Sequence, residues 1–152
     1  MTTLRRWCVD LLRSTCGVAA IEFAIIAPVL LVLIMSVIEL GLATRDSLRA
    51  QAAAAEGGYY AMKNGFDPGK IALAIVNGTG ASGLSASTAP ALFCGCPSAT
   101  GIAVTACDAT CGDGMAARKY VQVNASLART SVLDVQLGLP TVIIRQSIVR
   151  LP

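Results

Sequence analysis

A long apolar segment, from Val18 to Ala43, constrains this chain more than any other feature. Only Glu22 and Glu39 interrupt it with charge, and Arg45 and Arg49 follow it. A helix needs about 20 apolar residues to cross the ~30 Å hydrocarbon core of a bilayer. A cleavable secretory signal has a shorter apolar region, of about 7–15 residues. The segment therefore predicts a membrane-spanning helix that the protein retains.

Glu22 is the residue in this segment that most suggests a function. It is followed by Phe23 and a further uncharged run, and a carboxylate at the edge of hydrocarbon costs a few kcal/mol unless it is paired. Cleavage after Gly17 would create an amine at Val18, four residues or ~6 Å of helix from Glu22. Glycine leaves such a scissile bond uncrowded. The alternative interpretation is an interfacial glutamate whose carboxylate reaches water.

The composition excludes several classes of function. The chain is 55% hydrophobic and 14% charged, with a net charge of +3 and no histidine. No basic patch with interleaved aromatic residues is present, so nucleic-acid binding is not expected. The commonest general base and metal ligand is missing, and no nucleophile–base pair or phosphate-binding loop replaces it. We expect a protein that is not an enzyme and that carries no cofactor.

The segment after the span predicts a helix that continues to Asn64-Gly65. Its apolar residues recur at helical spacing, and they form a stripe of Leu48, Ala52, Ala55, Tyr59 and Met62. We expect this stripe to pack on the chain's own C-terminal head. The alternative is a seam that contacts helices of other subunits.

The C-terminal part predicts a small α+β head. Asp67-Pro68 is typical of a helix start, and residues 77–87 read as a flexible loop. Strands are expected over residues 91–96, 102–107, 121–127 and 141–149, the last as a covered strand. We expect an α+β fold with a long N-terminal helix, a short helix and an antiparallel sheet of about 3–4 strands, in a lollipop shape. The expected domains are a leader (1–17), a transmembrane helix (18–43), a stem (44–64) and the head (65–152).

Four cysteines in the head, Cys94, Cys96, Cys107 and Cys111, predict disulfides. A core of this size is marginal, so crosslinks would stabilise it. A Cys94–Cys96 bond would close a strained ring, which leaves two connectivities. A hairpin of the two short strands favours the nested one, with 94 bonded to 111 and 96 to 107. A four-cysteine zinc site is the competing interpretation, although the usual Cys-x2-Cys spacing is missing.

Disulfides form in oxidising compartments, which gives the chain a direction across the membrane. Arg5, Arg6 and Arg13 precede the span, and the positive-inside rule then places the N-terminus in the cytoplasm. We therefore expect a single-pass protein of the bacterial inner membrane with a periplasmic head.

The N-terminal motifs together resemble one family. Gly17-Val18-Ala19-Ala20-Ile21-Glu22-Phe23-Ala24, the apolar span, Ile38-Glu39-Leu40-Gly41 and the segment Ala53–Ala61 are similar to the TadE-like proteins, which are small pseudopilins of the Tad (Flp) type IV pilus system. The resemblance covers roughly the first 62 residues and, more weakly, residues 144–152. The family's processing motif has Tyr where this chain has Phe23. That change keeps the aromatic ring and loses its hydroxyl.

The resemblance implies a minor pilin or pseudopilin that takes part in assembly of a Tad (type IVc) pilus for surface adhesion and biofilm formation. Gly17 and Val18 would then be the processing site of a prepilin peptidase, and Glu22 with Phe23 the assembly motif. The implied partners are the peptidase, the major Flp-type pilin, other minor pilins, the inner-membrane pilus platform and the lipid bilayer.

Two other functions stay open at the level of sequence. One is a membrane-anchored periplasmic module that uses the four cysteines for metal binding or thiol redox chemistry. The other is an uncleaved envelope adaptor or adhesin that joins no pilus.

Overall fold

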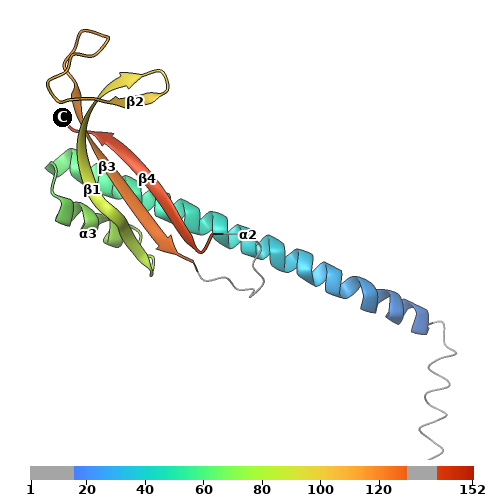
Figure 1. Cartoon of the computed structure of the whole chain (residues 1–152). Coiled ribbons are helices and arrows are strands. Elements are labelled where there is room, and N and C mark those ends of the chain that lie inside the picture. Colours follow the sequence, from blue (N-terminus) through green and yellow to red (C-terminus); the bar gives the residue numbers. More distant parts are fainter. Residues whose placement is uncertain (1–15, 130–139) are drawn as a thin grey trace, which may run out of the picture. The chain divides into compact units, whose positions relative to one another are not determined.

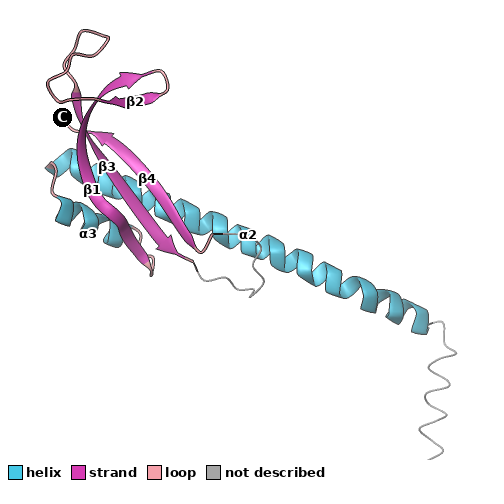
Figure 2. Cartoon of the chain, viewed as in Figure 1, coloured by secondary structure: helices cyan, strands magenta, loops and turns pink. Residues whose placement is uncertain are grey.

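The computed structural model describes residues 16–129 and 140–152, and these form two helices and four strands (Figures 1 and 2). Most of the expected leader, residues 1–15, lies outside the described residues. The elements follow the order α2 (Cys16–Asn64), α3 (Pro68–Gly78), β1 (Leu84–Ser98), β2 (Gly101–Val104), β3 (Arg118–Ala128) and β4 (Val142–Arg150). The predicted α+β fold, with a long helix, a short helix and an antiparallel sheet, is confirmed.

The chain divides into two compact units after Gly41. The first contains the N-terminal part of α2, which is long and apolar enough to cross a membrane, with a mean hydropathy of 2.7 in its most apolar window. The second, residues 42–152, contains the C-terminal part of α2, α3 and the sheet.

The ends of the two helices follow the local sequence. Helix α2 ends at Asn64, and Gly65 adopts a φ of 86°, a conformation that glycine reaches without strain. The Asp67 side chain then accepts a hydrogen bond from the backbone N–H of Lys70, with Pro68 in the first turn of α3. This helix start was predicted, and Ile71 and Ile75 of α3 are fully buried.

The sheet is antiparallel, with the order β2-β1-β3-β4. In β3 the side chains of Val121, Val123, Ala125 and Leu127 are buried, which confirms the predicted alternation. On the opposite face, polar side chains bond across the strands, with Ser85 Oγ 2.8 Å from Ser126 Oγ. One face of the sheet therefore supplies the core, and the other carries these polar side chains together with Ile144, Ile148 and the stacked rings of Phe93 and Tyr120.

Two predictions about strands are wrong. Strand β1 already begins at Leu84, so the expected loop over residues 77–87 is shorter than predicted. Pro90, which has no N–H to donate, lies beside a shift of register in this strand. Strand β4 is an edge strand, and Ile144 and Ile148 are exposed rather than covered.

The core of the second unit depends on a helix face made of small residues. Ala50, Ala53, Ala54 and Ala61 of α2 are buried and belong to the same cluster as the apolar residues of α3 and the sheet. A methyl group added at Gly57 would lie 2.7 Å from Cγ1 of Ile75 and 2.9 Å from Cγ1 of Val123. The small residues thus allow the helix backbone to approach α3 and the sheet closely.

Two disulfides, Cys94–Cys107 and Cys96–Cys111, join β1 to the segment after β2. Their Cα atoms are 5.0 Å and 5.4 Å apart, within the usual range. The predicted use of all four cysteines is confirmed, and the nested connectivity is wrong. The four sulfur atoms are paired, so these residues offer no thiolates to zinc in this state.

The register of the β1–β2 hairpin explains the pairing. Ser98 faces Gly101 and Cys96 faces Ala103. Cys107 lies four residues beyond the partner of Cys96, so this register does not bring the two cysteines together. The N–H of Thr105 instead donates to the carbonyl of Cys94, which brings Cys107 beside Cys94.

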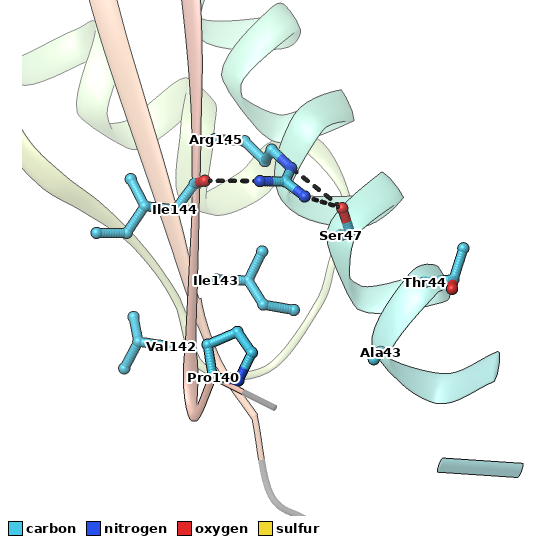
Figure 3. A pocket seen from close by; sticks show the side chains of 8 residues that line it. All are labelled: Ala43, Thr44, Ser47, Pro140, Val142, Ile143, Ile144 and Arg145. Carbon is cyan, nitrogen blue, oxygen red and sulfur yellow. Dashed lines mark hydrogen bonds between the residues drawn. The ribbon is translucent and has the colours of Figure 1, made fainter. Parts of the chain in front are cut away.

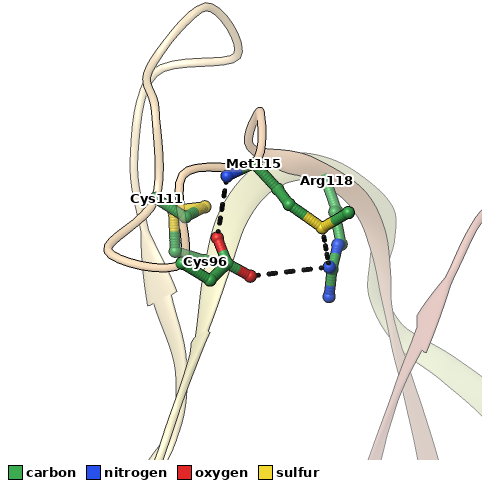
Figure 4. Close-up of polar contacts among 5 residues, drawn as sticks. Cys96, Cys111, Met115 and Arg118 are labelled. Carbon is green, nitrogen blue, oxygen red and sulfur yellow. Dashed lines mark hydrogen bonds and ion pairs between the residues drawn. A yellow bond between two sulfur atoms is a disulfide. The ribbon is translucent and has the colours of Figure 1, made fainter.

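The chain reverses between Cys107 and Cys111, where the N–H of Ala109 donates to the carbonyl of Ala106. This turn returns Cys111 to Cys96, next to Met115 and Arg118 (Figure 4). Hydrogen bonds fix the loop there, because the N–H of Met115 donates to Asp113 and Arg118 contacts both side chains.

We expect Gly57→Ala to destabilise the second unit. Alanine improves helix propensity by up to about 1 kcal/mol, but overpacking against branched, fully buried side chains costs about 1–3 kcal/mol. The net loss should lower the midpoint of thermal unfolding, measured by circular dichroism in detergent. Gly41→Ala, at a glycine of the same helix with no atom within 4 Å, is the control and should not lower it. An unchanged midpoint for both would contradict the close approach.

Single cysteine variants test the disulfide pairing. In Cys94→Ser the released thiol should be on Cys107, and in Cys96→Ser it should be on Cys111. Alkylation of the unfolded protein at low pH, followed by cleavage before Asp108, places the label on one side or the other by mass spectrometry. The reverse assignment would restore the nested connectivity. Each variant should also lose about 2–4 kcal/mol of stability.

Candidate functional site on the long helix

The predicted processing and assembly residues lie in the first turns of α2. Gly17 and Val18 belong to the first helical turn, and Glu22 and Phe23 follow one turn later. The side chains of Val18, Glu22 and Phe23 are exposed, and Phe23 is 69% exposed. In the helix, residues four apart lie on the same face. An amine created at Val18 would therefore lie on the face that carries Glu22.

The apolar run beyond Glu22 is suited to hydrocarbon surroundings. No part of its most apolar window is buried in the structure, so its large side chains are free to contact lipid or other helices. The hydroxyl group of Ser36, which lies in this run, forms a hydrogen bond within the helix: its Oγ donates to the carbonyl of Val32 at 2.7 Å. These features are consistent with a single-pass membrane anchor.

A second surface lies on the part of α2 that belongs to the second unit. The stripe expected to pack on the head is exposed, and that prediction is wrong. Leu48 is 62% exposed, Tyr59 56% and Met62 42%, and Ala52 and Ala55 are exposed between them. At 100° per residue this stripe lies opposite the buried face of Ala50, Ala53 and Ala61. We refer to Leu48, Ala52, Ala55, Tyr59 and Met62 as the outer stripe.

The difference between the two faces follows from side-chain size. Only small residues allow the helix backbone near the sheet, so Ala and Gly face inward and the larger apolar residues face outward. Hydrophobic periodicity alone does not reveal this, because alanine on the inner face and leucine or tyrosine on the outer face count equally as apolar. The distribution of small residues was the signal that could have located the packed face.

The four cysteines belong to a different part of the chain from the motif at Gly17–Phe23, since they lie in the second unit. Within residues 16–129 and 140–152, no group of three or more His, Cys, Asp or Glu side chains is placed to hold a metal ion. The two disulfides join β1 to the segment after β2, whereas the predicted processing residues and the outer stripe both lie on α2.

Comparison with known proteins gives one family. Residues 17–58 match the family model described as TadE-like protein, which covers most of α2 and ends before α3. No curated protein and no solved structure matches the chain closely enough to add a further relative. The matched residues include Gly17, Val18, Glu22 and Phe23 and most of the outer stripe. The resemblance that the sequence motifs predicted is therefore confirmed over residues 17–58, where the chain is similar to the TadE-like family.

Proposed function

We propose that this protein is a minor pilin or pseudopilin that takes part in assembly of a Tad-type pilus. The TadE-like segment suggests a protein associated with that pilus system. The observation that carries the finer proposal is the exposure of α2: its apolar N-terminal run and its outer stripe both present large apolar side chains outward. Such a helix is suited to lateral contact with lipid in one state and with other helices in another.

The first step we propose is cleavage by a prepilin peptidase after Gly17. The new ammonium group of Val18 and the carboxylate of Glu22 would then share one helix face. Pairing between them, or between Val18 of one subunit and Glu22 of the next, removes the cost of taking two separate charges out of water. The pair lowers the barrier to moving the helix from the bilayer into an assembly with the major pilin and other minor pilins.

The second step is contact through the outer stripe with a helix of a neighbouring subunit. Leu48 on one side and Tyr59 and Met62 on the other flank the small residues Ala52 and Ala55. A partner helix could therefore place its own side chains over the two alanines. This proposal assigns the protein a structural role in the envelope, with the head periplasmic before assembly and surface adhesion as the purpose of the pilus. It is not an enzyme but a substrate of the peptidase.

Glu22→Gln should reduce the amount of this protein in sheared pili by about tenfold or more. The variant leaves the ammonium of Val18 without its partner, and an unpaired charge away from water costs a few kcal/mol. Immunoblotting of purified pili gives the measurement, and mass spectrometry should find Val18 as the N-terminus. Glu56→Gln, the same change at an exposed residue of the second unit, is the control. An intact Met1 in piliated cells would refute processing, and normal incorporation of Glu22→Gln would refute the pairing.

Tyr59→Glu should impair incorporation into pili without destabilising the fold, because the tyrosine is 56% exposed and does not belong to the core cluster. A carboxylate in an apolar helix contact costs about 1–3 kcal/mol or more, which corresponds to a reduction of about fivefold or more. Gln51→Glu adds the same charge at an exposed position beside the outer stripe and should assemble normally. Equal incorporation of both variants, at equal thermal stability, would remove the stripe from the contact.

A further inference from the structure

A pocket between α2 and β4 lies where the second unit begins (Figure 3). Its volume is about 360 Å³, within the range of small-molecule sites. The helix contributes Ala43, Thr44 and Ser47, and the strand contributes apolar walls that include Val142 and Ile143. One charged side chain lines it, Arg145 of β4. The pocket thus combines apolar walls with a single cation.

Arg145 is held in place at this pocket. Its Nε and Nη2 donate to Ser47 Oγ at 3.0 Å and 2.6 Å, and its Nη1 donates to the carbonyl of Ile144 at 3.2 Å. Each Nη carries a second N–H, and the residue is exposed. Ser47 Oγ accepts both bonds, so its own O–H can donate. Among the residues that the structure describes, no carboxylate forms an ion pair with Arg145. The guanidinium is therefore oriented and accessible, and the described residues supply no carboxylate to neutralise it.

The position of the pocket along the chain indicates what it meets. Ala43 closes the apolar run, and Ser47 lies only about 8 Å of helix beyond Leu42. These residues therefore lie at the depth of the lipid headgroups when the apolar run spans a bilayer. Arg45 and Arg49 add positive charge to the same turns, against Asp46 alone. Lipid phosphates are thus the anions nearest to this part of the chain when the run spans a bilayer, and the net charge of an anionic phospholipid complements the excess of arginine here.

We propose that this pocket binds the headgroup of an anionic phospholipid, with the phosphodiester on Arg145 and Ser47. A guanidinium binds phosphate oxygens through parallel charge-assisted hydrogen bonds. The glycerol and first acyl carbons would lie against Ile143 and Pro140, which are on the side of β4 that faces Ser47. The proposal depends on the membrane anchor and not on pilus assembly, so either proposal can fail without the other.

The test uses the full chain, freed of lipid in a non-ionic detergent and titrated with phosphatidylglycerol or phosphatidylcholine under native mass spectrometry. We expect the wild type to retain phosphatidylglycerol preferentially and Arg145→Gln to bind it about tenfold or more weakly. Arg145→Lys keeps the positive charge but loses the planar set of N–H donors, so its affinity for phosphatidylglycerol should lie between those of the wild type and Arg145→Gln. Arg150→Gln removes the same charge from the far end of β4 and should bind like the wild type. Circular dichroism establishes that the variants are folded.

Three results would overturn the proposal. Equal weakening by Arg145→Gln and Arg150→Gln would mean that net charge, not this pocket, attracts the lipid. Undiminished binding by Arg145→Gln would remove the site altogether. Displacement of phosphatidylglycerol by inorganic phosphate at the same concentration as by a short-chain phosphatidylglycerol would identify a simple anion site, because the apolar walls would then contribute nothing.

Discussion

The close approach of helix α2 to α3 and the sheet is the interaction on which the rest of the second unit depends. Gly57 and its alanine neighbours leave room for Ile75 and Val123 against the helix backbone. This contact gives a small domain a core without requiring large side chains from the helix. It also fixes the rotation of the helix, and the large side chains of Leu48, Tyr59 and Met62 must then face outward. The small residues on one face of α2 therefore determine both how the core packs and which side chains remain on the surface for assembly.

Much of the fold could be predicted because its signals are local. The Asp67-Pro68 cap, the glycine after Asn64 and the alternation along β3 each depend on backbone geometry within a few residues. The features that could not be predicted depend on contacts between residues that are far apart in the sequence. The packed face of α2 depends on what approaches it, and the cysteine pairing depends on where the β1–β2 turn falls. A shift of that turn by a few residues would have favoured the nested disulfides.

Some residues of the candidate sites could likewise be identified from the sequence, and others could not. Gly17, Val18, Glu22 and Phe23 could be identified from the sequence, because a carboxylate beside a long apolar run is unusual in itself. The pocket at Arg145 could not, because Ser47 and Arg145 are 98 residues apart in the sequence and meet only through the packing of β4 on α2. The outer stripe was visible as a pattern, but its assignment to solvent required the structure.

The two ends of the sheet are stabilised by different means. Near the start of β4, Ile143 joins the core beside the helix, and the pocket forms on this framework. At the other end, Cys94 faces Lys119, and the described residues from 87 to 119 contribute no member to the core cluster. With no apolar core to hold it, the β1–β2 hairpin and the loop after it depend on crosslinks. The disulfides therefore replace burial at the end of the sheet where the described residues add nothing to the core cluster, which assigns them a structural role.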